Sequence, residues 1–124
     1  MNSIKMIRLC DNGDIDTVTI SRDNDYAALR DMYTAIGKGC SAIETVPVTP
    51  WGFDAVLIAD EYGLDSTNAE VNVLASAVSG CKIVGNVLFT AVGMVNGDMD
   101  FTGLTDEQIV HVMNILRKIG RNAY

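Results

Sequence analysis

Two aromatic side chains in a short loop are the residues best suited to recognise a ligand. Trp51 and Phe53 flank a glycine and follow two prolines, Pro47 and Pro50. Because aromatic rings stack on nucleobases and on the side chains of other proteins, an exposed pair would form a binding platform. If the loop folds back, the same rings pack into the core instead. The sequence leaves both interpretations open, and the first predicts ligand-binding roles for Trp51 and Phe53.

A second group of candidates lies in the polar segment after the next expected strand. Asp60 and Tyr62 belong to a turn, and Asn68 stands at the expected start of a helix. The backbone amides at a helix N-terminus attract anions. Asp60, Tyr62 and Asn68 are therefore predicted to line the same pocket as the aromatic loop, unless they serve only as turn and cap residues.

An anionic ligand would also need a cation, because arginine and lysine bind phosphates. The candidates are Arg8, Arg22 and a cluster near the C-terminus that consists of Arg117, Lys118 and Arg121. We expect Arg8 and Arg117 to contribute. The aromatic loop, the polar turn and these cations are not adjacent in sequence. The pocket therefore exists only if the fold or an oligomer brings them together.

No pattern typical of an enzyme or a metal site accompanies these residues. His111, the only histidine, has no serine or cysteine beside it to act as a nucleophile. Cys10, Cys40 and Cys81 lack CxxC spacing, supply too few zinc ligands and are expected to be buried free thiols. The acidic turns near the N-terminus lack the glutamate of a calcium-binding loop. The sequence thus predicts no catalytic residues, no metal, no cofactor and no enzymatic activity.

Composition narrows the class of protein further. The chain has 124 residues, of which 48% are hydrophobic, and is expected to form a single domain over residues 1–124. Nine Lys and Arg against sixteen Asp and Glu give a net charge of −7, which disfavours binding to duplex nucleic acid. No apolar run is long enough to span a membrane and no secretory signal is visible, so a cytoplasmic location is expected.

The elements that must position these residues follow from periodicity and turn signals. Asn-Gly pairs at 12–13 and 96–97 predict tight hairpin turns, and the spacing of Thr67 and Glu70 and of Thr105 and Gln108 predicts capping boxes. The pattern indicates an α+β fold with a mainly antiparallel sheet, three helices and the order ββαββαββα. The expected strands cover residues 4–10, 15–20, 40–48, 53–59, 83–92 and a return segment through 99–101, and the expected helices cover 26–36, 67–79 and 105–119.

The first helix is expected to bury one apolar stripe, because apolar residues recur at spacings of three and four. A glycine at position 85 interrupts the most apolar strand and suggests a bulge or a close backbone approach. Glycines 37, 80 and 120 are expected to end the three helices. The members of the first stripe are Tyr26, Leu29, Met32, Tyr33 and Ile36.

Three stretches together resemble a known family. They cover residues 41–48, residues 59–64 with Asn68-Ala69, and residues 80–88. In this order they are similar to the "IE-V" strand, the acidic "(N/D)E-x-G-L" turn and the "I-x-G-(N/D)-V-(L/V)" strand of a small phage and mobile-element family, domain of unknown function 3846. The chain departs from that family at Asn68-Ala69 and in a longer C-terminal helix. The resemblance implies a phage or plasmid origin and no settled activity.

Small phage accessory proteins without catalytic residues commonly act by binding. The first hypothesis is a homo-oligomer that antagonises host antiviral defence by sequestering a nucleotide-derived signal. The alternative is an acidic inhibitor that binds a host defence enzyme, for which a charge of −7 suits a basic groove. The expected partner is accordingly either a nucleotide-like small molecule or a host protein, and neither duplex nucleic acid nor a membrane.

Overall fold

The structure, a computed structural model, describes residues 2–65 and 69–123. This part of the chain forms six antiparallel strands and three α-helices in the order ββαββαββα. The predicted α+β class and element order are therefore confirmed. The elements are β1 (Ser3–Leu9), β2 (Ile15–Ser21), α1 (Asp25–Ile36), β3 (Ile43–Val48), β4 (Ala55–Asp60), a 3-10 helix (Gly63–Asp65), α2 (Val73–Ser79), β5 (Val87–Val95), β6 (Asp98–Phe101) and α3 (Asp106–Ala123).

The strands form one sheet in the order β2-β1-β5-β4-β3. β5 is central, because Phe89 on this strand lies opposite both Ile7 of β1 and Leu57 of β4. β6 pairs with the second half of β5, off the main path of the sheet. The outer strands of the main path are β2 and β3.

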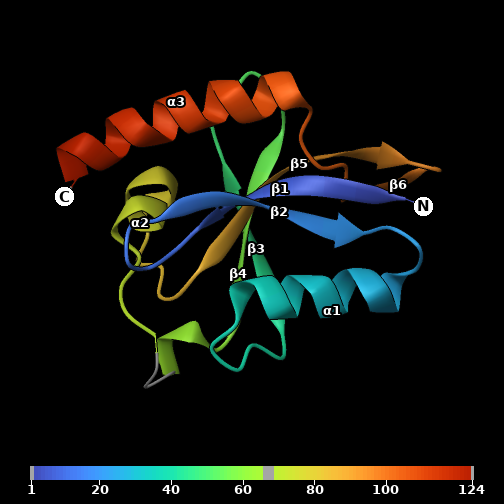
Figure 1. Cartoon of the computed structure of the whole chain (residues 1–124), viewed down its shortest axis with the longest axis horizontal. Helices are drawn as coiled ribbons and strands as arrows, with labels where there is room; N and C mark the ends of the chain where they lie inside the picture. The colour runs from blue at the N-terminus through green and yellow to red at the C-terminus, as the bar shows by residue number, and fades with distance from the viewer. Residues whose placement is uncertain (1, 66–68, 124) are drawn as a thin grey trace.

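Helices cover both faces of this sheet (Figure 1). Successive side chains of a strand point to opposite faces. Leu57 and Phe89 belong to the core beneath α2 and α3, whereas Ile58 and Leu88 belong to the core beneath α1. Residues 55–59 are buried throughout, which confirms the prediction of a central strand in this region.

Both Asn-Gly pairs form tight hairpin turns, as predicted, but with different geometry. In the β5–β6 turn, Asn96 and Gly97 have φ values of 53° and 89°, and Val95 pairs directly with Asp98. In the β1–β2 turn only Gly13 has a positive φ, 97°. This turn is wider because three residues separate Cys10 from Asp14, whose carbonyl accepts the Cys10 N–H at 2.8 Å.

The helix starts show which capping signals were reliable. The Thr105 N–H donates to Gln108 Oε1 at 2.9 Å, and the Gln108 N–H donates to Thr105 Oγ1 at 3.1 Å. This reciprocal pair confirms the predicted capping box of α3. At α1 the Asn24 side chain accepts from the Ala27 N–H at 2.8 Å.

The expected buried stripe of α1 is wrong at its N-terminal end. Tyr26 is 76% exposed and Leu29 is 37% exposed, whereas Ala27, Met32 and Ile36 are buried. Ala28 and Ala35 also pack against the core beneath α1, so alanines occupy part of the buried face where larger side chains were expected.

α3 also differs from expectation, because it continues past Gly120 to Ala123. Within the described segments, no helix combines the length and the apolar character needed to cross a bilayer.

The second predicted helix and the fifth strand both begin later than expected. Thr67 lies outside the described residues, and α2 begins only at Val73, capped by the side chain of Asn72. β5 begins at Val87 rather than at residue 83. Gly85 precedes it with a φ of 85°, and its N–H donates to the Glu70 carbonyl at 2.8 Å. A Cβ at this position would meet only the Ala69 Cβ, at 3.5 Å, so the glycine is explained by its positive φ and not by the bulge or close backbone approach predicted within a strand.

Candidate functional site

A hollow of 630 Å³ lies between the β1–β2 turn, α2 and the C-terminal half of α3. In Figure 1, α2 and the end of α3 are adjacent on this side of the molecule. We call this hollow the α3 groove. It is lined by Gly13, Ile15, Leu74, Leu116, Arg117, Gly120 and Arg121.

The floor of the α3 groove is apolar and firmly held. Leu74 and Leu116 are 1% and 0% exposed and belong to the core beneath α2 and α3. Asn72 fixes α2, because its Nδ2 donates to the carbonyls of Leu9 at 2.9 Å and Gly85 at 2.8 Å. Its Oδ1 accepts from the Ala75 N–H at 3.0 Å. Since Asn72 is fully buried and all these bonds are made, the groove floor is rigidly tied to β1.

The rim of the α3 groove is basic. Arg117 and Arg121 lie one helical turn apart and both line the groove. Arg117 contacts Met113 Sδ at 3.9 Å, and Arg121 Nε donates to the Arg117 carbonyl at 3.4 Å. Neither forms an ion pair with a carboxylate of the described residues, and the same holds for the neighbouring Lys118, which does not line the groove.

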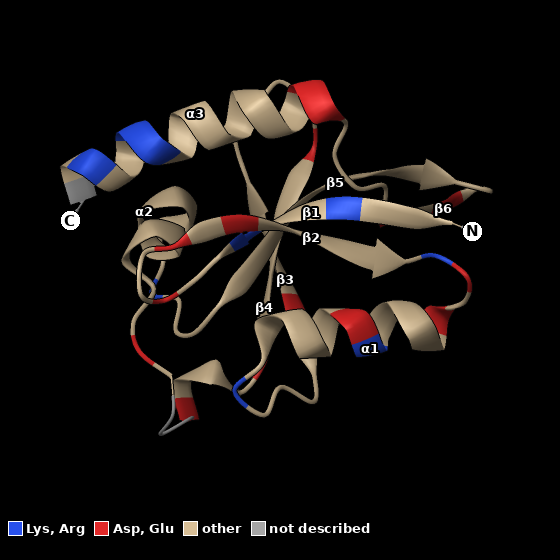
Figure 2. Ribbon diagram, in the orientation of Figure 1, with Lys and Arg blue, Asp and Glu red and all other residues tan. Residues whose placement is uncertain are grey.

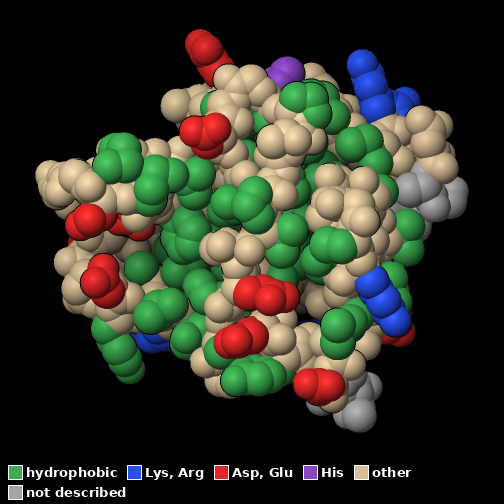
Figure 3. All heavy atoms as spheres, turned by 180° about the vertical axis from the view of Figure 1, so that it is seen from behind, with side chains coloured by type: hydrophobic (Ala, Val, Ile, Leu, Met, Phe, Trp, Pro, Cys, Tyr) green, Lys and Arg blue, Asp and Glu red, His purple; other side chains and the backbone are tan. Residues whose placement is uncertain are grey.

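The C-terminal end of α3 is basic, although the chain as a whole carries a net charge of −7. Figure 2 shows Lys and Arg at the C-terminal end of α3 and Asp and Glu at its start. Seen from behind, basic side chains protrude at the corner beside the end of α3, and carboxylates together with a few further basic side chains are spread over the rest of this face (Figure 3). The α3 groove therefore combines an apolar floor with cations that have no anionic partner among the described residues.

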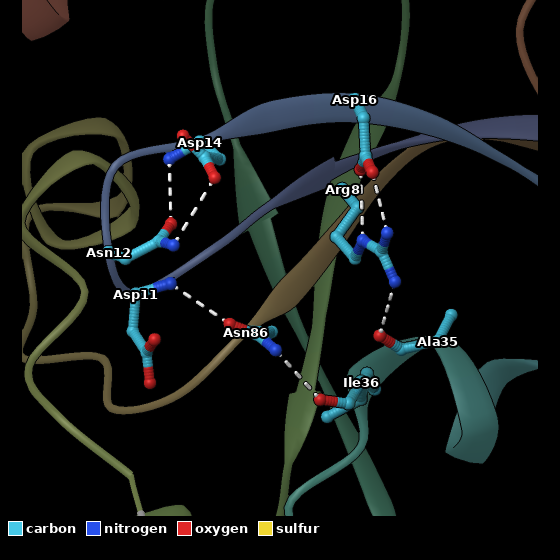
Figure 4. A network of polar contacts seen from close by, with 8 residues as sticks. All are labelled: Arg8, Asp11, Asn12, Asp14, Asp16, Ala35, Ile36 and Asn86. Carbon is cyan, nitrogen blue, oxygen red and sulfur yellow. Dashed lines mark hydrogen bonds and ion pairs between the residues drawn. The ribbon is translucent and has the colours of Figure 1, made fainter.

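Arg8, a predicted ligand contact, is occupied within the fold (Figure 4). Its Nε and Nη2 donate to the two carboxylate oxygens of Asp16, at 2.9 and 2.5 Å, and its Nη1 donates to the Ala35 carbonyl at 3.1 Å. The hydrogen bond to Asp16 raises the pKa of the Arg8 guanidinium. Arg22 is held similarly by Asp100 and by the Phe101 carbonyl. Neither arginine is free to bind a phosphate.

The interpretation of Trp51 and Phe53 as an exposed stacking platform is wrong. Trp51 is 6% exposed and its ring meets that of Phe89 edge-on, with centroids 4.9 Å apart. Phe53 is half-buried and lies 6.5 Å from the same ring. The loop folds back because the apolar face of the sheet beneath α3 offers both rings more contact than solvent does.

The other predicted contacts lie at the opposite end of β4. Asp60 closes a turn by accepting the Tyr62 N–H at 2.9 Å, and Tyr62 is 56% exposed. Asn68 lies outside the described residues, and the helix N-terminus expected there begins instead at Val73. Because β4 spans about 17–20 Å, one chain does not bring this turn and the aromatic loop into a common pocket. Of the predicted residues, only Arg117 lines the α3 groove.

The sequence matches a known protein family over most of its length. A family model described as "Domain of unknown function (DUF3846)" matches residues 4–117. The chain belongs to this family. The membership predicted from the three short stretches is thereby confirmed, and the match ends at Arg117, within the α3 groove. Arg121 lies beyond the matched region.

One solved structure similar to this DUF3846 chain is titled "Crystal structure of small RNA methyltransferase HEN1". The two are 20% identical with a TM-score of 0.61, and the alignment covers 98% of this chain and 18% of that one. At this identity the likeness shows the fold alone. The DUF3846 chain corresponds to less than a fifth of the methyltransferase chain, so that protein's activity has no bearing on the site. No curated protein matches the sequence.

The cysteine, histidine and acidic side chains of the DUF3846 chain were the candidates for a metal site or a nucleophile. In residues 2–65 and 69–123, no three His, Cys, Asp or Glu side chains are placed to hold a metal ion. Cys10 and Cys40 are partly buried, and this burial raises the pKa of both thiols. Cys81 is exposed, so its expected burial is wrong. His111 is exposed on α3.

Sequence reasoning missed the residues that form the groove floor. Ile15, Leu74 and Leu116 lie within the strand and helices that the sequence predicts, but none of the three was a candidate for a site. One signal was available: Arg117 and Arg121 have the four-residue spacing that places two side chains on one face of a helix. Nothing in the sequence indicates that this face borders a hairpin turn.

Proposed function

We propose that this DUF3846 protein is a non-enzymatic binding protein that captures a nucleotide-derived molecule in the α3 groove. The observation that carries this proposal is the juxtaposition of an apolar floor with Arg117 and Arg121, neither of which has a carboxylate partner among the described residues. A hollow of 630 Å³ falls within the range of about 300–1,000 Å³ typical of small-molecule sites.

The two parts of the groove suit the two parts of a nucleotide. Guanidinium groups bind phosphate oxygens in pairs and also stack on planar rings. Arg117 and Arg121 are about 5–6 Å apart along the helix, so they can share one phosphate or each bind one of two. Ile15 is half-buried and offers apolar surface for a base or sugar, above a floor that contains the buried Leu74 and Leu116. Stacking on Trp51 and Phe53 is no longer part of the proposal.

We further propose that the protein acts in the cytoplasm of a host cell, as a phage or mobile-element accessory protein that sequesters a signal of antiviral defence. This setting is supported by the origin that the family resemblance implies. Sequestration needs one binding site for each signal molecule rather than turnover. A small protein without converging catalytic groups in its described residues is suited to that role.

The proposal is tested by isothermal titration calorimetry with cyclic dinucleotides, cyclic trinucleotides and cyclic ADP-ribose variants. At least one of these should bind. For that compound, Arg117→Gln and Arg121→Gln should each weaken the affinity about tenfold or more, because each removes a charged hydrogen bond worth about 1.5–3 kcal/mol. Lys118→Gln is the matched control, since it removes the same charge from the same helix end but lies outside the groove. Equal losses in all three variants, or no binding by any compound, would refute the proposal.

A second candidate function is inhibition of a host defence enzyme by an acidic surface. It is favoured by a different region, where Glu44, Asp60 and Glu61 line one small cavity beside the 3-10 helix, together with Lys82. Such a surface complements a basic partner and would give association rates that fall steeply with salt. The double variant Glu44→Gln and Glu61→Gln should abolish this interaction and leave nucleotide binding unchanged.

A further inference from the structure

The two outer strands of the sheet differ in how well they are protected from pairing with another strand. Proline has no N–H to offer, and Pro47 stands within β3. β2 has neither proline nor glycine, and five of its seven residues are Ile, Val or Thr, which favour strands. An unprotected outer strand of this kind is a template for a further strand.

Hydrogen bonds at one end of β2 establish which backbone groups face outward. The Arg22 N–H donates to the Asn2 carbonyl at 2.9 Å and therefore points into the sheet. The Ser21 N–H points outward and donates to Asp31 Oδ2 of α1 at 2.8 Å. Because the direction alternates along a strand, the N–H and C=O groups of Ile15, Thr17 and Thr19 also point outward. Among the described residues no side chain or strand bonds to them.

We propose that β2 pairs antiparallel with β2 of a second copy of the chain, about a twofold axis at Thr17. In this register Thr17 faces Thr17, and Ile15 of each copy faces Thr19 of the other. All three pairs join outward-facing residues, so each exchanges two backbone hydrogen bonds. The register leaves the Ser21 N–H with its Asp31 partner and uses only the three residues whose outward groups have none.

The charge pattern of β2 permits this self-pairing. Asp16 is the only charged residue of the strand, and Arg8 already neutralises it through two hydrogen bonds. The two copies therefore bring no unpaired like charges together. Asp16 and Arg8 lie opposite each other on the α1 face, away from the groove.

The pairing would add to the α3 groove. Ile15 and Thr17 lie opposite Leu9 and Ile7, which belong to the core beneath α2 and α3, so the odd-numbered side chains of β2 point to that face. Thr19 of the second copy would then lie beside Ile15, which lines the groove. Each groove gains a hydroxyl from the other copy. This inference does not depend on the proposed function, because the strands pair with or without a ligand.

The first test measures mass by sedimentation and amide hydrogen exchange by NMR, from micromolar to near-millimolar protein. The mass should double with concentration. The Thr17 and Thr19 amides should become protected in step with it, whereas the Val18 and Ile20 amides, which point toward β1, should be protected throughout. A monomer at every concentration, or a dimer in which the Thr17 and Thr19 amides exchange freely, would overturn the proposal.

A substitution pair provides the second test. Thr17→Pro removes an outward N–H of β2 and should yield a monomer. Thr45→Pro makes the same change at an outward position of β3 and should remain a dimer. Thr45 faces outward because Ala42, whose carbonyl accepts the Glu61 N–H, faces β4, and the direction alternates along the strand. If Thr17→Pro does not fold, the amide hydrogen exchange of the unmodified chain still tests the proposal. A monomeric Thr17→Pro that binds the same nucleotide would separate this inference from the proposed function.

Discussion

The arginines beside β1 and β2 and the arginines at the end of α3 have the same chemistry and opposite availability. Arg8 and Arg22 are each fixed by an aspartate and a backbone carbonyl. Arg117 and Arg121 contact only a sulfur and a carbonyl of their own helix within the described chain. The first region uses its polar groups to hold the fold together, and the second leaves them available to a ligand.

The difference arises from what lies opposite each side chain. Arg8 and Asp16 are direct partners in the β1–β2 ladder, and this proximity holds the ion pair in place. In α3 the acidic residues, Asp106 and Glu107, are confined to the first turn, more than two turns from Arg117. In a chain of net charge −7, the cations at the end of α3 thus lack an anionic partner among the described residues because this part of the helix supplies no carboxylate within reach.

The largest expected effect belongs to Trp51, for which the sequence left a ligand contact and a core position open and which the structure places in the core. Trp51→Ala should lower the free energy of unfolding by about 3–5 kcal/mol, because it removes a buried ring packed on Phe89. Urea unfolding followed by circular dichroism measures it. Trp51→Phe should cost clearly less, since it retains part of the ring contact. A Trp51→Ala variant of unchanged stability would return this residue to the list of ligand contacts.

The next largest effect is expected at Asn72, which ties α2 to β1 beneath the α3 groove. Asn72→Ala should cost about 2–4 kcal/mol, because it removes the helix cap and leaves the buried carbonyls of Leu9 and Gly85 without their donor. Asn72→Ser should cost less, since serine restores the cap alone. Equal unfolding midpoints for the two variants would show that the cap contributes nothing, and an Asn72→Ser variant as stable as the unmodified chain would show the same for the carbonyl contacts.

The fold was largely predictable because its signals are local. Asn96-Gly97, the Thr105–Gln108 capping box and the buried run of β4 each depend on neighbours in sequence. The start of α2 was not predictable in this way, because Asn72 is specified by carbonyls 63 and 13 residues away. The buried face of α1 was not predictable either, because it depends on packing against strands that are distant in sequence.

The candidate site was predictable only in its charge. The sequence singled out Arg117 with Lys118 and Arg121, but no local pattern distinguishes these cations from Arg8, whose partner lies across a hairpin. The groove floor joins Ile15, Leu74 and Leu116, which are separated by 59 and 42 residues along the chain. Such a surface exists only once the sheet has brought a hairpin turn against two helices.

Arg8 provides a smaller but more direct test of the contrast. Arg8→Gln should lower the free energy of unfolding by about 0.5–1 kcal/mol, the range of a partly exposed ion pair, and leave nucleotide affinity unchanged. A double-mutant cycle with Asp16→Asn isolates the pair, and the coupling should account for most of that cost. If Arg8→Gln weakened nucleotide binding as strongly as Arg117→Gln, the two regions would not differ as argued.

The smallest expected effect on stability belongs to the rim of the groove. Arg117→Gln and Lys118→Gln should each change the free energy of unfolding by less than about 0.5 kcal/mol, because an exposed cation near a helix C-terminus contributes only a screened interaction with the helix dipole. Urea unfolding at low and high salt measures this, and the two variants should agree. Their nucleotide affinities should nevertheless differ, since only Arg117 lines the groove. A loss of stability in Arg117→Gln close to that in Arg8→Gln would mean that this arginine, too, serves the fold.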